Sequence, residues 1–125
     1  MAFDSIIPYA AAADLSAKQY FALKDNGSGA AAAIAADTDV PVGILQNKPA
    51  VVGASCSIKY YGVSKAVLGG TVAKGDLLGP SATGALVKRT VGTDATRYVM
   101  ARAGAAGVSG DIIPVVLIPV PFRAA

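Results

Sequence analysis

The sequence predicts an all-β protein, arranged as a single small sandwich or barrel. All eight acidic residues are Asp and none is Glu, and Asp favours turns and caps whereas Glu favours helix interiors. The chain also contains 14 Gly and 7 Pro, which interrupt helices. Short apolar runs are separated by turn residues about every 8 to 12 positions, a spacing typical of sandwiches and barrels.

The start of the chain is predicted to be an extended N-terminal arm at residues 1–14, before a single β domain at residues 15–125. The segment shows no sustained hydrophobic period and contains Pro8. It carries four apolar side chains that need a surface to lie on, since leaving them in water would forgo several kcal/mol at roughly 25 cal/mol per Å². These are Phe3, Ile6, Ile7 and Tyr9. Two interpretations remain open: the arm packs on another protein or protomer, or it adds an edge strand to its own sheet.

The first half of the domain is predicted to contain four strands, at Gln19–Lys24, Ala30–Ala36, Val42–Leu45 and Ser55–Tyr61. The alanine run is too short for a stable isolated helix and lies between turn sequences, so it is assigned to a hairpin. The last of the four alternates cleanly, which places Cys56 and Ile58 on one buried face. Tyr60 and Tyr61 then point to opposite faces, and Tyr61 becomes a candidate interface residue.

The second half is predicted to bring the total to eight or so short strands, with a bulge or bend at Gly62 before the next of them. Residues 71–73 lead into a turn at residues 74–76, and residues 77–78 leave it. The strands are Val63–Leu68, Ala85–Thr90, Arg97–Ala103 and Ile112–Ile118. The last is a continuous β-branched run, typical of a core strand. Pro119 and Pro121 are expected to end it and to leave Phe122 and Arg123 as a short tail.

Few residues are suited to catalysis or metal binding. The chain has no histidine, so the usual acid/base near neutral pH and the commonest metal ligand are missing. The single cysteine, Cys56, forms no intramolecular disulfide and is expected to be a small buried hydrophobe. Asp37 and Asp39 are the closest acids, but a calcium loop would need a glycine where Val42 stands, so a solvated turn is expected. We therefore expect no enzyme activity, no cofactor and no metal site.

Charge and hydropathy narrow the choice of partners. A net charge of +3 and a pI near 9.1 are mildly basic, yet the cations are scattered and Lys88–Arg89 is the only adjacent pair. Nucleic-acid binding is not indicated, whereas docking on an acidic protein surface and simple solubility both fit. The mean hydropathy of +0.52 is high, but no apolar run approaches the roughly 20 residues that span a bilayer. The acidic start, Met1–Asp4, lacks the basic region of a signal peptide.

The order of several segments resembles the family of phage capsid cement (head decoration) proteins, once known only as a domain of unknown function. The segments are residues 14–24, 41–49 with the sequence PVGILQNKP, 62–67, 74–78, 84–87 and 110–117. The resemblance implies a jelly-roll-like fold and a small homo-oligomer, a dimer in preference to a trimer. It also implies binding to the outer face of a major capsid protein lattice, and hence a place on the outside of the virion after synthesis in the bacterial host cytoplasm.

These considerations give a set of candidate residues for contact with the capsid or a second protomer: Phe3, Ile6, Ile7, Tyr9, Tyr61 and Phe122. Two other function classes stay open. A small β-barrel module that binds a carbohydrate or other ligand would need an aromatic platform, and the chain has no Trp and only 6% aromatic residues. An enzyme would have to rely on Asp, Ser, Lys or Tyr alone, and no convergent motif of these residues is present.

Overall fold

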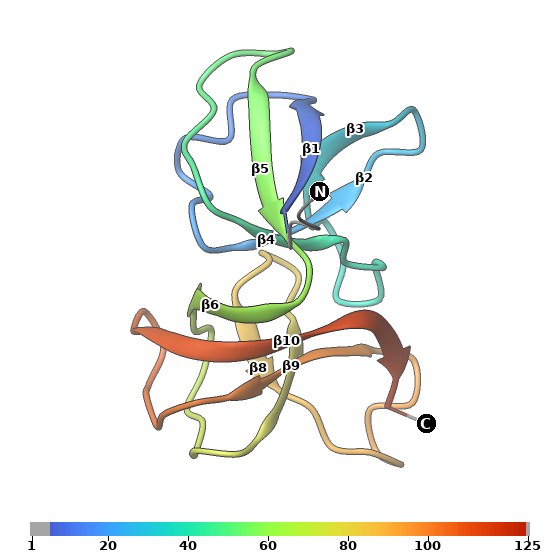
Figure 1. The fold of residues 1–125 in the computed structure, drawn as a ribbon. Coiled ribbons are helices and arrows are strands. Elements are labelled where there is room, and N and C mark those ends of the chain that lie inside the picture. Colours follow the sequence, from blue (N-terminus) through green and yellow to red (C-terminus); the bar gives the residue numbers. More distant parts are fainter. Residues whose placement is uncertain (1–5, 125) are drawn as a thin grey trace, which may run out of the picture.

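The computed structural model describes residues 6–124, with only the backbone described at positions 6 and 7. This part of the chain forms ten strands and no helix, which confirms the all-β prediction (Figure 1). The strands are β1 (Ile6–Ala11), β2 (Ala22–Asp25), β3 (Ala30–Ala33), β4 (Gly43–Leu45), β5 (Ser55–Lys59), β6 (Gly62–Val67), β7 (Leu77–Pro80), β8 (Leu86–Lys88), β9 (Tyr98–Ala103) and β10 (Ile112–Arg123). Strands β1 to β5 close into a barrel, and β6 to β10 form a second sheet against one end of it.

The barrel has the strand order β1-β3-β2-β4-β5, and β1 pairs with β5 to close it. The predicted alanine hairpin is present, because β3 pairs antiparallel with β2. A barrel of five strands has a narrow interior, and small side chains fit where larger ones would clash. The interior is accordingly filled by Ala11, Leu15, Leu23, Ala31, Leu45, Cys56 and Ile58.

Residues 6–11, predicted to belong to an extended N-terminal arm, form the first strand of the barrel. The β domain therefore begins before residue 15, where its start was predicted. Strand β1 pairs with β5 at five positions, from Ile6 opposite Lys59 to Ala10 opposite Ser55, and with β3 at two. The segment could pack on another protein or join the protein's own sheet, and residues 6–11 do the second. The strand is held because it satisfies backbone groups of β3 and β5 that an open barrel would expose.

The second sheet is antiparallel throughout, in the order β6-β10-β9-β7-β8. Strand β10 continues to Arg123, so the expected end at Pro119 and the expected tail at Phe122 are wrong. Leu117 is the last residue of β10 that pairs with β6, and the register with β9 shifts between Leu117 and Phe122. Pro119 and Pro121 lie within this irregular stretch, where their missing N–H groups remove no regular ladder bond.

The two tyrosines assigned to opposite faces of one strand lie instead in the crossover between the sheets. Strand β5 ends at Lys59, and Gly62, with φ of 87°, turns the chain into β6 at the predicted bend. The rings of Tyr60 and Tyr61 meet edge to face, with centroids 4.9 Å apart. The period of two that separates neighbours on a strand does not apply beyond its last residue.

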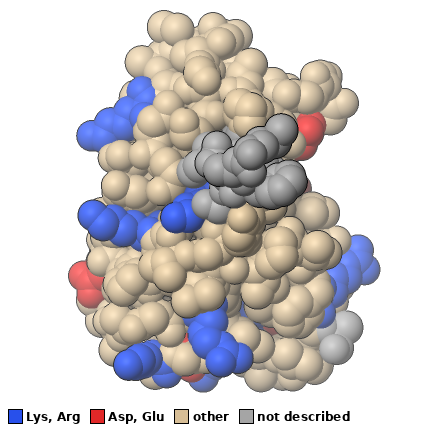
Figure 2. Space-filling view, in the orientation of Figure 1, with Lys and Arg blue, Asp and Glu red and all other residues tan. Residues whose placement is uncertain are grey.

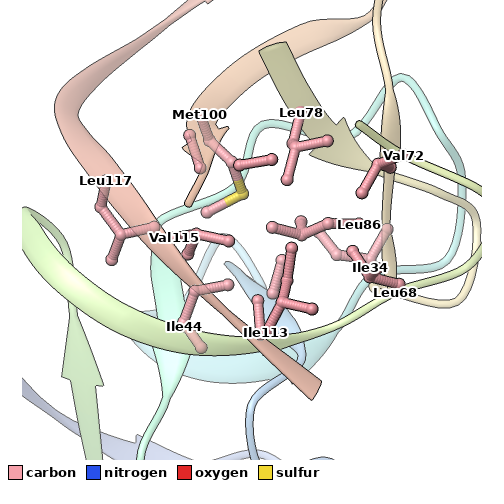
Figure 3. Close-up of a cluster of buried hydrophobic side chains, with 14 residues drawn as sticks. Ile34, Ile44, Leu68, Val72, Leu78, Leu86, Met100, Ile113, Val115 and Leu117 are labelled. Carbon is pink, nitrogen blue, oxygen red and sulfur yellow. The ribbon is translucent and has the colours of Figure 1, made fainter. Parts of the chain in front are cut away.

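A second core lies between the barrel and the second sheet (Figure 3). Strands β2 and β4 of the barrel contribute to both cores. Leu23 and Leu45 point into the barrel, while their neighbours Ala22 and Ile44 point out of it and pack against the second sheet. All four residues are fully buried. The larger side chains that share this core with Ile44 are Ile34, Leu68, Val72, Leu78, Leu86, Met100, Ile113, Val115 and Leu117.

Polar contacts also join the two sheets. Gln46, which follows β4, donates a hydrogen bond from Nε2 to Oγ of Ser64 on β6 at 2.9 Å. Among the described residues, Ser64 is the one polar residue that is buried. The N–H of Ala22 donates to the carbonyl of Gly84 at 2.9 Å. Gly84 has φ of 89°, and a Cβ there would come within 2.6 Å of the Ala22 carbonyl oxygen, so this approach requires glycine.

The turn with Asp37 and Asp39, expected to be solvated, is held by ion pairs. Asp39 accepts N–H bonds from Ala35 and Ala36 at 2.9 and 3.0 Å and pairs with Lys24 at 3.1 Å. Asp37 pairs with Arg97 at 3.1 Å, which ties the barrel to the segment before β9. These contacts give both carboxylates a structural role.

The place of β1 in the barrel can be tested with two neighbouring alanines. Ala11 is buried in the barrel core, whereas Ala10 is exposed on the same strand. Ala11→Asp should lower the free energy of unfolding by roughly 3 kcal/mol or more, because it buries an unpaired carboxyl group. Ala10→Asp should change it by less than about 0.5 kcal/mol. Urea unfolding measures both, and equal small effects would mean that the segment is not part of the barrel.

Asp39 should make stability depend on pH. The N–H of Ala35 contributes most to lowering the pKa of Asp39, burial opposes it, and the N–H of Ala36 and the charge of Lys24 lower it further. Because the folded state holds this proton less tightly, the contribution of Asp39 is present above about pH 4 and is lost as the pH falls below that value. Asp39→Asn should cost about 1 kcal/mol at neutral pH and progressively less in acid, while Thr38→Ala should show no such trend. A penalty for Asp39→Asn that stayed constant down to about pH 3 would contradict this assignment.

Candidate binding surface

The second sheet has one face on the shared core and one face in solvent. On the solvent face the strand register aligns a row of residues across four strands. Val116 of β10 lies opposite Val63 of β6 on one side and opposite Arg102 of β9 on the other, and Arg102 lies opposite Leu77 of β7. Val63 and Val116 are 61% and 48% exposed. We call this solvent-facing side of β6, β10, β9 and β7 the outer face.

A groove of about 590 Å³ lies on the outer face. Its lining is apolar except for one charged side chain, Arg102. The lining residues are Leu77, Val99, Ala101, Arg102, Val116, Ile118 and Phe122. Within residues 6–124 no hydrogen bond or ion pair joins the guanidinium of Arg102 to another group, so its charge faces solvent above an apolar floor.

Residues 112–118, predicted to be a core strand, contribute only one face to the core. Ile113, Val115 and Leu117 are buried in the shared core, whereas Ile112 and Val116 are 54% and 48% exposed. The apolar run therefore covers both faces of β10, only one of which is packed. Soluble monomers seldom leave large contiguous apolar areas in water, so we take this face as the candidate binding surface.

The charges on this part of the sheet have one sign. Strands β6, β9 and β10 carry Lys65, Arg102 and Arg123 and no Asp. Arg123 lies over the ring of Tyr98 at 5.8 Å, and Lys65 lies at the same distance over the ring of Tyr20. Figure 2 shows scattered Lys and Arg, few acidic groups and wide uncharged areas on the side of the molecule in view. Lys65, two residues after Val63 on β6, and Arg102 are thus the cations of a largely apolar outer face.

A second hollow, of about 470 Å³, lies where the barrel meets the second sheet and is lined by Tyr20, Lys65, Ile112, Ile113 and Pro114. Tyr20 has φ of 67°, in the left-handed region. Its N–H donates to the carbonyl of Leu45 at 2.7 Å, and its carbonyl accepts from the N–H of Val67 at 3.0 Å. These two bonds link β4 to β6, so the strained conformation serves the joint between the sheets.

The structure does not bring the predicted contact residues together. Phe3 lies outside the described residues, and the backbones of Ile6 and Ile7 belong to β1. Tyr9 is half-buried against the barrel core, and its hydroxyl donates to Oδ2 of Asp25 at 3.3 Å. Tyr61 is half-buried in the crossover.

Of the predicted set, Phe122 is the residue that lines the groove, and it is 45% exposed. Sequence reasoning missed Leu77, Arg102 and Val116. The signal for this surface was the unbroken apolar run of β10, whose neighbour β6 alternates between exposed and buried residues. An antiparallel sheet normally keeps one face polar when that face is in water.

Other features of the described chain are structural. Cys56 is fully buried, as predicted, and burial raises the pKa of its thiol. Residues 6–124 hold no cluster of three or more His, Cys, Asp or Glu side chains placed to bind a metal ion. The same residues form no helix with the length and hydropathy to cross a membrane.

Burial of Cys56 predicts a slow thiol reaction. In the folded protein, reaction with a disulfide reagent at neutral pH should be at least about 100-fold slower than in the unfolded chain, because the thiol is both inaccessible and protonated. The rate is read from absorbance with and without urea. A native rate close to the unfolded rate would contradict the placement of Cys56 in the barrel core.

Comparison with known proteins supports the fold. No protein-family model matches the sequence, and no curated protein matches it. Among solved structures, the chain is similar to the crystal structure of the head fiber gp8.5 N base in bacteriophage phi29. The two share 16% sequence identity with a TM-score of 0.67, over 94% of this chain and 97% of the other. At this level of identity the similarity establishes a shared fold, which extends over the barrel and the second sheet together.

Proposed function

We propose that this protein is a structural component of a phage head, a cement protein that binds the outer surface of the assembled shell and stabilises it. The observation that supports this most is the fold similarity to the base of a phage head fiber along nearly the whole of both chains. A fold shared over only one of the two sheets would be weaker support, because small β-barrels serve many functions. The resemblance of the ordered sequence segments to capsid cement proteins agrees with the fold.

The physical requirement for such a role is differential binding. A protein that binds the assembled shell more tightly than free capsid subunits adds its binding free energy to the stability of the shell. Each contact can be weak, because copies that bridge several subunits gain from multivalency. No catalytic group is needed, and we propose that the protein is not an enzyme and uses no cofactor.

The proposed partners are the major capsid protein and further copies of this chain, as a homodimer in preference to a homotrimer. The apolar outer face supports the need for a protein partner. The groove offers Arg102 as its charged side chain and Phe122 as its aromatic one. A sugar site needs several convergent hydrogen-bonding groups, so the groove favours a protein segment over a carbohydrate.

The proposal can be tested with shells of the phage that encodes this chain, prepared without the protein. Purified protein should co-sediment with the shells and raise their melting temperature by several degrees, because its binding favours the assembled state. An unrelated β-protein of similar size and net charge is the control. If the protein stays in the supernatant and the shells melt at an unchanged temperature, the proposed function is wrong.

A further inference from the structure

We infer that the outer face of the second sheet is the docking surface of this protein, and that it receives an apolar segment of the shell protein with a carboxylate that pairs with Arg102. This inference rests on the proposed function and assigns the site at which it takes place. It replaces residues 6–11 as a candidate attachment device, because these residues close the barrel.

The exposed apolar side chains gather on this sheet. The described chain exposes ten large hydrophobic residues, and five of them lie on β6 and β10. These five are Val63, Ile112, Val116, Val120 and Phe122. The other five lie in four loops: Val40, the adjacent Val51 and Val52, Val91, and Val108. A contiguous surface with a groove is therefore found on the sheet and not on the barrel.

The charge of the groove specifies the occupant. Covering the outer face would remove water from Arg102, and no described residue supplies an anion to it. Burying an unpaired guanidinium is costly, whereas a planar bidentate pair with a carboxylate compensates much of that cost. The partner segment must therefore bring an Asp or Glu side chain next to its apolar side chains.

A second copy of this chain fits the outer face poorly. In a two-fold interface the same surface meets itself, so the cations of one copy would approach those of the other. The charged side chains on the outer face of these strands are Lys65 and Arg102, and the strands carry no acid. The charge pattern therefore favours a different chain as the occupant and places any self-association elsewhere on the molecule.

Three variants test the inference on whole shells. Val116→Asp places a carboxylate in the lining of the groove, Phe122→Ser removes its aromatic side chain, and Arg102→Glu reverses its charge. The matched control is Val52→Asp, at an exposed valine in the loop before β5. Melting temperature and far-UV circular dichroism establish which variants are folded, and co-sedimentation with shells that lack the protein gives each affinity. Sedimentation velocity of each protein alone gives its oligomeric state.

The inference predicts that all folded groove variants bind shells at least about tenfold more weakly than the wild type, as expected for loss of a central contact. Val52→Asp should bind as the wild type does. Added salt should weaken the wild type more than Arg102→Glu, because only the wild type forms the proposed ion pair.

Other outcomes separate the two proposals. If the wild type binds shells and the folded groove variants bind equally well, the docking surface is wrong while the proposed function stands. If the variants lose a dimer but keep shell affinity, the occupant is a second copy and the inference is overturned. If the wild type itself fails to bind shells, the proposed function fails and the docking site with it.

Discussion

Burial of the barrel wall on both of its faces is the constraint on which the rest of the structure depends. Ala22 and Ile44 face the second sheet, while their neighbours Leu23 and Leu45 face the barrel interior, and none of the four is exposed. A barrel of five strands encloses little volume, so much of its stability comes from packing against the second sheet. The same contact buries the inner face of that sheet and leaves its outer face as the large surface available for binding.

Part of the fold could be predicted from local sequence. The features that could not be predicted depend on pairing between strands that are distant in the sequence. The alternation at Cys56 and Ile58 and the bend at Gly62 follow from side-chain period and backbone freedom, and both are present. The role of β1 could not be derived in this way, since a segment without a clear period is a strand only because β3 and β5 lie beside it. The passage of β10 through two prolines likewise depends on a register shift that no local pattern contains.

The candidate site was predicted least well, for a related reason. Phe122 was identified as a contact residue, but Arg102 and Leu77 join it through pairings between β7, β9 and β10. An unbroken apolar strand is compatible with two packed faces or with one packed and one binding face. The number of layers decides between them, and this protein has no layer over the outer face among its described residues.

The most direct test of this account is an image of the decorated head at side-chain resolution by electron cryomicroscopy. The account predicts that the outer face lies against the shell, with density from a capsid segment over Val116 and a carboxylate beside Arg102, and that the barrel projects away from the shell. A map in which the outer face is open to solvent and the barrel rests on the capsid would contradict it.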